Sequence, residues 1–291
     1  MAEREGTDSP RAVLHDIRYS RYDGVLRPRS SAVSGFVASS VRRPLGLRRS
    51  AGSKVWPFLL LAAAYLPALA VVAVPLLVPQ VPLQPTELIS YPNLLTTNSV
   101  VLLAFVATAV PSMLTRDRRD RVLSLYFATA LSWVEYVVGT ALAAVVLLAL
   151  VVLGPLLVLF VGSIATADDP GGWLGDNLGD LPRIVLAALL VVLFHAALGL
   201  AVGSLTSKRV FAVGGYLAVV LVGPVITRVL ALVLASDWPL ALDPTTGPVL
   251  LATAVLDGSG GPGTLAWVVW SVVVAGGFGL LARRYSGGSD A

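Results

Sequence analysis

Six long apolar stretches, each almost free of charge, constrain this chain more than any other feature of its sequence. No Asp, Glu, Lys or Arg occurs in Val55 to Thr86, Leu88 to Thr115, Tyr136 to Ala167, Ile184 to Ser207 or Gly258 to Ala282. The stretch from Val210 to Ser236 contains a single charge, Arg228. A helix needs roughly 20 apolar residues to cross a hydrocarbon core about 30 Å thick. Continuous rather than alternating apolar character favours helices over the strands of an outer-membrane barrel.

We therefore predict an all-α polytopic membrane protein with six transmembrane helices, near residues 56–79, 97–115, 137–162, 183–206, 210–235 and 264–282. Composition agrees with this fold class. Hydrophobic residues make up 56% of the chain and charged residues 13%, whereas soluble domains have roughly 45–50% and about 25%. The chain has no cysteine, which excludes a disulfide-stapled domain and a thiolate metal site.

The basic residues are distributed asymmetrically between alternate loops. Residues 1–54 hold eleven Lys and Arg, and eight more lie in 115–121, in 207–209 and in the tail 283–291. The three remaining loops, about 80–96, 163–182 and 236–263, contain Asp and Glu but no Lys or Arg. The positive-inside rule then predicts cytoplasmic termini and places these three loops outside. The expected organisation is a cytoplasmic N-terminal segment (1–54), a six-helix transmembrane domain (55–282) and a cytoplasmic tail.

The N-terminal segment ends in a short pattern that is typical of an interfacial helix. Val33, Phe36, Val37 and Val41 recur at helical spacing, and five basic residues follow within 42–54. We predict an amphipathic helix on the inner leaflet, held by its apolar face and by anionic lipid. The alternative is a solvated basic linker that only sets the topology. Nucleic-acid binding is not expected, because the topology already accounts for these charges.

The region between the second and third spans carries the most information about function. It begins with Arg116-Asp117-Arg118-Arg119-Asp120-Arg121 and continues to Glu135-Tyr136. A helix over about 116–132 would carry these charges first and then place Val122, Leu125 and Tyr126 along one side. We predict such a helix parallel to the membrane. The alternative is an ordinary loop that is anchored at the interface by its aromatic residues.

This arrangement resembles the permeases of ABC-2 type transporters. The matching features are the basic cluster, the helix with Leu and Tyr, a Leu-Ser pair, Glu135-Tyr136 and Gly139. The stretch from His195 to Arg209 and the segment Leu240-Ala-Leu-Asp-Pro244 are similar to the family's fourth span and to its external re-entrant segment. His15 to Tyr19 and Arg21 to Gly24 resemble a group of actinobacterial permeases. Ala130 and Thr140 depart from the family pattern, which often has Pro and Lys there.

The resemblance implies that the chain is the transmembrane permease subunit of an ATP-binding cassette transporter, an exporter that is driven by ATP hydrolysis on a separate ATPase subunit. The segment of about 116–132 would be the coupling helix that docks into an ATPase subunit in a bacterial cytoplasmic membrane. Two permease copies, or this chain and a paralogue, would pair with two ATPase subunits. The residues assigned to ATPase coupling are Arg116, Arg118, Arg119, Arg121, Leu125, Tyr126 and Glu135.

 Membrane lipid is the other expected partner.

The sequence lacks the motifs of an enzyme that would drive transport by itself. It contains no G-x-x-x-x-G-K-[ST] phosphate loop and no H-E-x-x-H motif, and its two histidines are His15 and His195. We therefore expect no catalytic residue, bound cofactor or metal in this chain. Under the resemblance, ATP and Mg²⁺ belong to the partner ATPase.

Thr227 and Arg228, in the fifth predicted span, are the candidates for a translocation pathway. A charge at this depth costs a few kcal/mol unless it faces a partner or a wet cavity. Arg228 either lines a pathway beside Gly223-Pro224 or extends outward as a structural residue. His195, in the fourth predicted span, is either a packed, hydrogen-bonded neutral histidine or a functional residue. An ion-coupled secondary transporter and a membrane scaffold or signalling protein remain the alternatives to the exporter.

Overall fold

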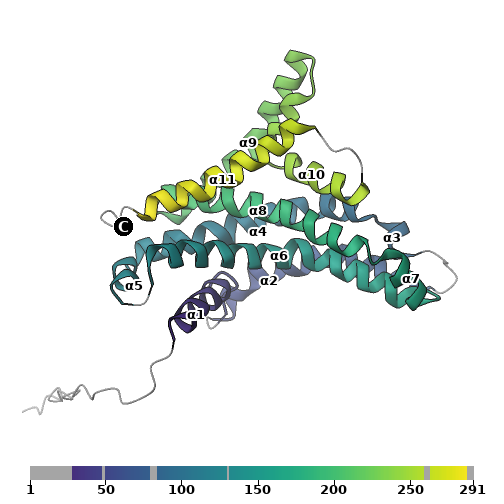
Figure 1. Ribbon diagram of the computed structural model, residues 1–291, viewed down its shortest axis with the longest axis horizontal. Coiled ribbons are helices and arrows are strands. Elements are labelled where there is room, and N and C mark those ends of the chain that lie inside the picture. Colours follow the sequence, from purple (N-terminus) through teal and green to yellow (C-terminus); the bar gives the residue numbers. More distant parts are fainter. Residues whose placement is uncertain (1–27, 48–49, 79–83, 130, 259–262, 287–291) are drawn as a thin grey trace, which may run out of the picture.

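The computed structural model describes residues 28–47, 50–78, 84–129, 131–258 and 263–286 (Figure 1). Every regular element in these residues is a helix. Six helices are long and apolar enough to cross a membrane, as the sequence predicts: α2 (Gly52–Leu77), α4 (Tyr91–Arg119), α6 (Trp133–Thr166), α8 (Asp180–Leu205), α9 (Arg209–Leu234) and α11 (Thr264–Ser286). The shorter elements are α1 (Arg29–Arg42), α3 (Pro85–Leu88), α5 (Leu123–Thr129), α7 (Pro170–Asn177), η1 (Trp238–Leu242) and α10 (Thr246–Asp257).

Several of the long helices extend beyond the spans predicted for them. The second begins at Tyr91 rather than near 97, where the hydroxyl of Ser90 accepts a hydrogen bond from the amide of Asn93 (3.4 Å). The third begins at Trp133 rather than near 137. Helix ends are therefore set here by capping groups and not by the limits of hydropathy.

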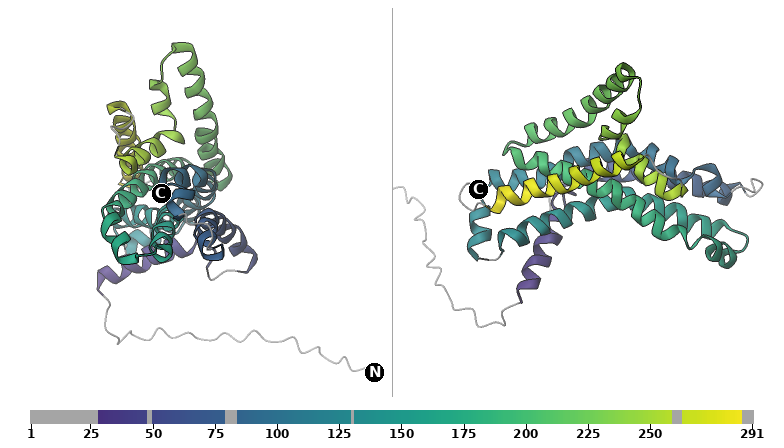
Figure 2. Two further views of the ribbon diagram at one scale, coloured as in Figure 1. Left: turned by 90° about the vertical axis from the view of Figure 1, so that its right-hand side faces the viewer. Right: turned by 45° about the horizontal axis from the view of Figure 1, so that its top comes forward.

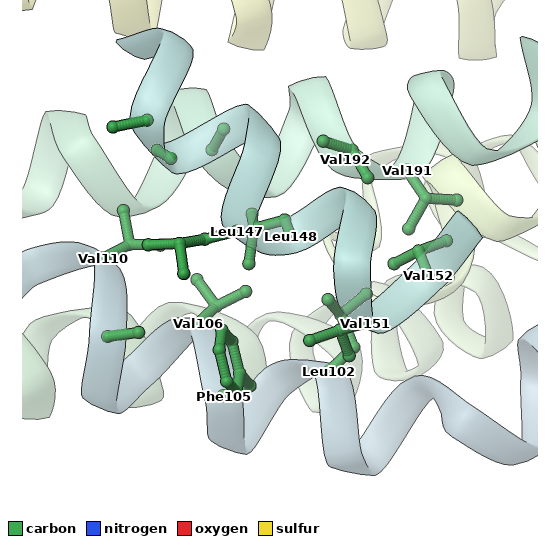
Figure 3. Close-up of a cluster of buried hydrophobic side chains, with 14 of the residues drawn as sticks. Leu102, Phe105, Val106, Val110, Leu147, Leu148, Val151, Val152, Val191 and Val192 are labelled. Carbon is green, nitrogen blue, oxygen red and sulfur yellow. The ribbon is translucent and has the colours of Figure 1, made fainter. Parts of the chain in front are cut away.

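Helix α8 lies at the centre of the bundle. It packs against α4, α6, α10 and α11, and 67% of its most apolar window is buried, compared with 11% for α9. Figure 3 shows side chains of the resulting core, to which α4 contributes Leu102, Phe105, Val106 and Val110. Because lipid tails are as apolar as these side chains, close packing rather than water exclusion holds such helices together.

Two glycines let α8 approach α4 closely. A Cβ atom on Gly199 would lie 3.0 Å from Val110, and one on Gly203 would lie 3.1 Å from the Cα atom of Pro111. The Gly199-x-x-x-Gly203 pattern is thus a packing contact within the chain, as small residues at this spacing permit.

The bundle has two distinct ends. Helices α1 and α5 and the C-terminal end of α11 lie at one end, and α3 and α7 lie at the other (Figure 1). Arg42, Arg43, the arginines that end α4, and Arg283 and Arg284 are at the first end, which we call the basic end. Helix α9 stands apart from the other long helices over its second half (Figure 2).

The predicted external loop of 236–263 is largely helical. It contains η1 and α10, and α10 packs against α8 and α4. With 12 residues, α10 measures roughly 18 Å and is too short to cross a bilayer.

Candidate functional site at the basic end

The connection between α4 and α5 differs from the single helix predicted over 116–132. Helix α4 continues to Arg119, and α5 spans only Leu123–Thr129. Between them Arg121 has a positive φ of 52°. The amide of Val122 donates to the carbonyl of Asp117 and that of Arg121 to the carbonyl of Arg118, both at 3.2 Å. This is a Schellman motif, which ends α4 and separates α5 from most of the basic cluster.

A buried carboxylate joins three helices beside this turn. Asp117, which is 4% exposed, accepts a hydrogen bond from Arg43 Nη1 at 3.0 Å on Oδ1 and one from the Tyr136 hydroxyl at 3.2 Å on Oδ2. Arg43 Nη2 also donates to the hydroxyl of Tyr126 at 2.9 Å. Asp117 belongs to α4, Arg43 follows α1, Tyr126 belongs to α5 and Tyr136 to α6. We call these four side chains the Asp117 network.

Aromatic rings pack around the same point. The ring of Tyr136 lies 5.4 Å from Phe36, 5.8 Å from Phe127 and 5.2 Å from Tyr285, measured between centroids. Tyr136 and Tyr285 are almost fully buried. Offset and edge-to-face ring pairs of this kind stabilise contacts beyond the area that they bury, so α1, α5, α6 and α11 meet in one aromatic cluster.

The charges at this end perturb two groups that lie outside the membrane-spanning segments. Burial acts to lower the pKa of Arg43, but the hydrogen bond to Tyr126 and the charge of Asp117 outweigh it and raise this pKa above its ordinary value. Hydrogen bonds from Arg119 and Arg116 lower the pKa of Asp120, which is exposed. Arg43 and Asp120 therefore both keep their charges at neutral pH.

The four arginines assigned to ATPase coupling occupy three different settings. Arg116 and Arg119 share Asp120, at 3.3 and 3.1 Å. Arg118 donates to the carbonyl of Ser204, at the end of α8, and its guanidinium lies 5.2 Å from the ring centroid of Tyr285. Arg121 is in the turn before α5 and is exposed.

The other three residues assigned to coupling lie at α5 and at the start of α6. Tyr126 points into the Asp117 network and is half-buried. Leu125 is in α5, and its side chain is outside the described part of the structure. Glu135 accepts hydrogen bonds from the amide (2.7 Å) and the hydroxyl (2.8 Å) of Ser132, which forms a capping box at the start of α6.

The candidate pathway residues lie on α9, far along the sequence from this network. Thr227 is buried and donates to the carbonyl of Pro224 at 3.1 Å, whereas Arg228 is exposed. His195, in α8, is buried, and its Nδ1 atom lies 2.9 Å from the hydroxyl of Tyr216 in α9. The structure does not bring these residues together with the basic end, and the His195–Tyr216 hydrogen bond joins two packed helices.

Sequence reasoning missed Arg43, Phe36 and Asp117 as parts of this site. Arg43 and Asp117 are 74 positions apart, so no local spacing connects them. A signal for Glu135 was present, because Ser132-x-x-Glu135 is the pattern of a capping box. The motif His15 to Gly24 lies outside the described residues. Within the described residues, no group of three or more His, Asp or Glu side chains could hold a metal ion.

The sequence was compared with protein-family models and with curated proteins, and neither comparison gave a match. The case for a function therefore rests on the sequence patterns and on the geometry of the basic end.

Proposed function

We propose that this chain is the membrane-spanning permease subunit of an ATP-binding cassette transporter of the ABC-2 type, and that it acts as an exporter. The observation that carries the proposal is the attachment of α5 to the long helices. A short helix between the second and third spans is held through Tyr126 and Arg43 to the buried carboxylate of Asp117. A force on α5 would thus reach α1, α4 and α6 together.

The proposed mechanism is mechanical. An ATPase subunit binds the exposed surface of α5, which includes Ser124 and Ala128, and pushes it when ATP closes the ATPase dimer. The Asp117 network transmits this displacement to α4 and α6, because hydrogen-bonded charge pairs hold their geometry better than apolar contacts do. The long helices then tilt and change access to the pathway. ATP and Mg²⁺ remain on the partner.

A second permease copy, or a paralogue, completes the proposed assembly. Helices α2 and α9 support this part, because 17% and 11% of their most apolar windows are buried within the chain. Lipid and a partner helix are both suited to such surfaces. The bacterial cytoplasmic membrane, with both termini inside, is the proposed location, supported by the gathering of basic residues at one end.

Purification in a mild detergent from the native membrane tests the proposal. An ATPase subunit that carries a phosphate loop should copurify with the chain, and Ser124→Arg should weaken this association by at least about tenfold, equivalent to 1.4 kcal/mol. Ser34→Arg, on the exposed side of α1 at the same end, is the matched control. The absence of any ATPase from the wild-type preparation would contradict the proposal.

The variant Tyr126→Phe separates two steps: binding of the ATPase to α5, and transmission of its displacement to the long helices. This change removes the hydroxyl that accepts from Arg43 and keeps the ring. We expect normal copurification of the ATPase with a several-fold lower transport rate per ATP hydrolysed in proteoliposomes. Unchanged coupling would mean that the Asp117 network does not transmit the displacement.

A further inference from the structure

A large cavity opens at the basic end, beside the Asp117 network. Its volume is about 1150 Å³, and its lining comes from the end of α1, the start of α2, the second half of α4 and the start of α9. Along α4 the lining runs from Phe105 to Arg119, which corresponds to roughly 21 Å at 1.5 Å per residue. The cavity therefore reaches from the charged end of the bundle well into the apolar part of the helices.

Cations dominate the mouth of the cavity. Arg116, Arg118, Arg119 and Arg121 line it from the end of α4 and the following turn, and Lys208 and Arg209 line it from the start of α9. The carboxylate on its wall, Asp117, is committed to Arg43 and Tyr136. Walls of low dielectric constant focus the field of such a cluster and concentrate anions within it.

Apolar side chains of the lining, among them Phe105 and Met113, alternate with hydroxyl groups such as Thr108 and Ser112, and the lining continues onto an exposed apolar surface. Trp56, Val210 and Phe211 line the cavity and are 51%, 80% and 65% exposed. They begin α2 and α9, two of the three long helices that are least buried within the chain, and both helices pack against α4. A ligand can therefore reach the cavity sideways from the lipid as well as from the aqueous side.

We infer that this cavity binds an anionic amphiphile, whose phosphate-type headgroup contacts Lys208, Arg209 and Arg119 and whose hydrocarbon chain lies along the apolar wall. A small soluble anion would use the cations but not the apolar depth. A zwitterionic lipid would use the apolar wall but would bring its own cation to the cluster. The inference goes beyond the proposed function, because it concerns binding to this chain and does not require an ATPase.

Fluorescence of Trp56 in nanodiscs measures this binding directly. The purified full-length chain is placed in phosphatidylcholine nanodiscs that contain a minor fraction of brominated phosphatidylglycerol or, separately, brominated phosphatidylcholine. The contribution of Trp56 is the difference between the wild type and Trp56→Phe. We expect brominated phosphatidylglycerol to quench Trp56 half-maximally at a content about tenfold or more below that needed with brominated phosphatidylcholine. Each nearby cation contributes roughly 1 kcal/mol to anionic lipid binding.

Paired variants separate the cavity from the general charge of the basic end. Lys208→Gln/Arg209→Gln should lose the preference for the anionic lipid, and Lys208→Arg/Arg209→Lys should keep it. Arg283→Gln/Arg284→Gln, at the same end but outside the cavity lining, is the control for an equal loss of charge and should also keep the preference. Equal loss in both glutamine variants, or no preference in the wild type, would overturn the inference.

Competition identifies the chemical class of the ligand. Soluble inorganic phosphate should displace the brominated lipid only weakly at physiological ionic strength, since it gains nothing from the apolar wall. Complete displacement by phosphate would show that the cavity is a site for small anions. Complete displacement by a polyglutamate peptide would show that it accepts an acidic protein segment. Either result overturns the assignment to an amphiphile.

Discussion

Asp117 is the residue that ties together the most elements at the basic end. The residue is 4% exposed, and its carboxylate contacts Arg43 and Tyr136. Replacing one member of a buried ion pair leaves the other charge without compensation and costs about 3–5 kcal/mol. The side chain of Arg43 is 36% exposed, so solvent reduces this cost.

We therefore predict that Asp117→Asn lowers the free energy of unfolding by about 1–3 kcal/mol. Thermal unfolding in detergent measures this loss. Asp120→Asn is the control, because Asp120 is exposed and its ion pairs with Arg116 and Arg119 are at the surface. We expect a clearly smaller loss there, because solvent screens exposed ion pairs. Equal losses in the two variants would contradict a special role of Asp117.

Arg121 holds the turn between α4 and α5 in a conformation that its side chain disfavours. A residue with a Cβ atom in the left-handed region is roughly 1–2 kcal/mol less favourable than in the right-handed one, and glycine has no such penalty. We predict that Arg121→Gly stabilises the chain by up to about 1 kcal/mol and that Arg121→Val destabilises it. Chemical denaturation of the two variants in detergent gives both values. A more stable valine variant would show that the turn is not as described.

The pairing of Arg43 with Asp117 marks the limit of prediction at the residue scale. Charge patterning showed where basic residues gather, because the positive-inside rule acts on counts of residues in each loop. It could not show which arginine meets which carboxylate, because that depends on how α1, α4 and α6 pack. The Schellman motif escaped prediction for a related reason, since arginine occupies the position where glycine usually signals it.

At the scale of elements, the contact between α1 and α6 depends on Gly139. A Cβ atom there would lie 2.8 Å from Cδ1 of Phe36, and the ring of Phe36 is held between Tyr126 and Tyr136. We predict that Gly139→Val costs about 1–3 kcal/mol by overpacking and loosens α1. Limited trypsin digestion should then cleave faster after Arg42. Gly35→Val, where a Cβ atom meets nothing within 4 Å, should leave the cleavage rate unchanged.

The start of α10 should depend on pH. Asp243 Oδ1 accepts hydrogen bonds from the amide and hydroxyl of Thr245 and from the amide of Thr246, at 2.8, 2.7 and 3.2 Å. Burial acts to raise the pKa of Asp243, but these bonds lower it below 3.8. A carboxyl group whose pKa is lower in the folded state contributes stability above its unfolded pKa of about 4 and loses it as the pH falls through the folded pKa.

Hydrogen exchange measures this effect on α10. We predict that exchange in α10 accelerates below about pH 4 relative to α7, beyond the intrinsic pH dependence of exchange. Asp243→Asn should exchange faster than the wild type at neutral pH and lose the additional acid response. An identical acid response in the asparagine variant would assign the effect to another group.

Hydropathy located the six long helices but not the short ones. A continuous apolar stretch of about 20 residues matches the thickness of the hydrocarbon core. The existence of each long helix therefore follows from the sequence. The starts of α4 and α6 depend on Ser90 and Ser132, which are polar and precede the predicted spans near 97–115 and 137–162. Helix α10 is apolar but packs against α8 within a region that charge alone marked as an external loop.

At the scale of the whole molecule, the absence of cysteine makes the orientation directly measurable. Gly175→Cys in α7 and Gly35→Cys in α1 place single thiols at opposite ends of the bundle, each where a Cβ atom meets nothing within 4 Å. We predict that an impermeant thiol reagent labels Gly175→Cys in intact cells and labels Gly35→Cys only after lysis. The reverse pattern would invert the proposed topology and remove α5 from reach of a cytoplasmic ATPase.

The second half of α9 diverges from the other long helices and packs against η1 and Pro244. Beyond Val220, the one buried residue of α9 is Thr227, and Gly223 touches Pro244, to which a Cβ atom would come within 2.9 Å. The second half of this helix is therefore held by few contacts within the chain. Its angle to the membrane normal is set less by this chain than by whatever occupies the space beside it, so the same polypeptide would hold the helix differently in lipid and in an assembled transporter.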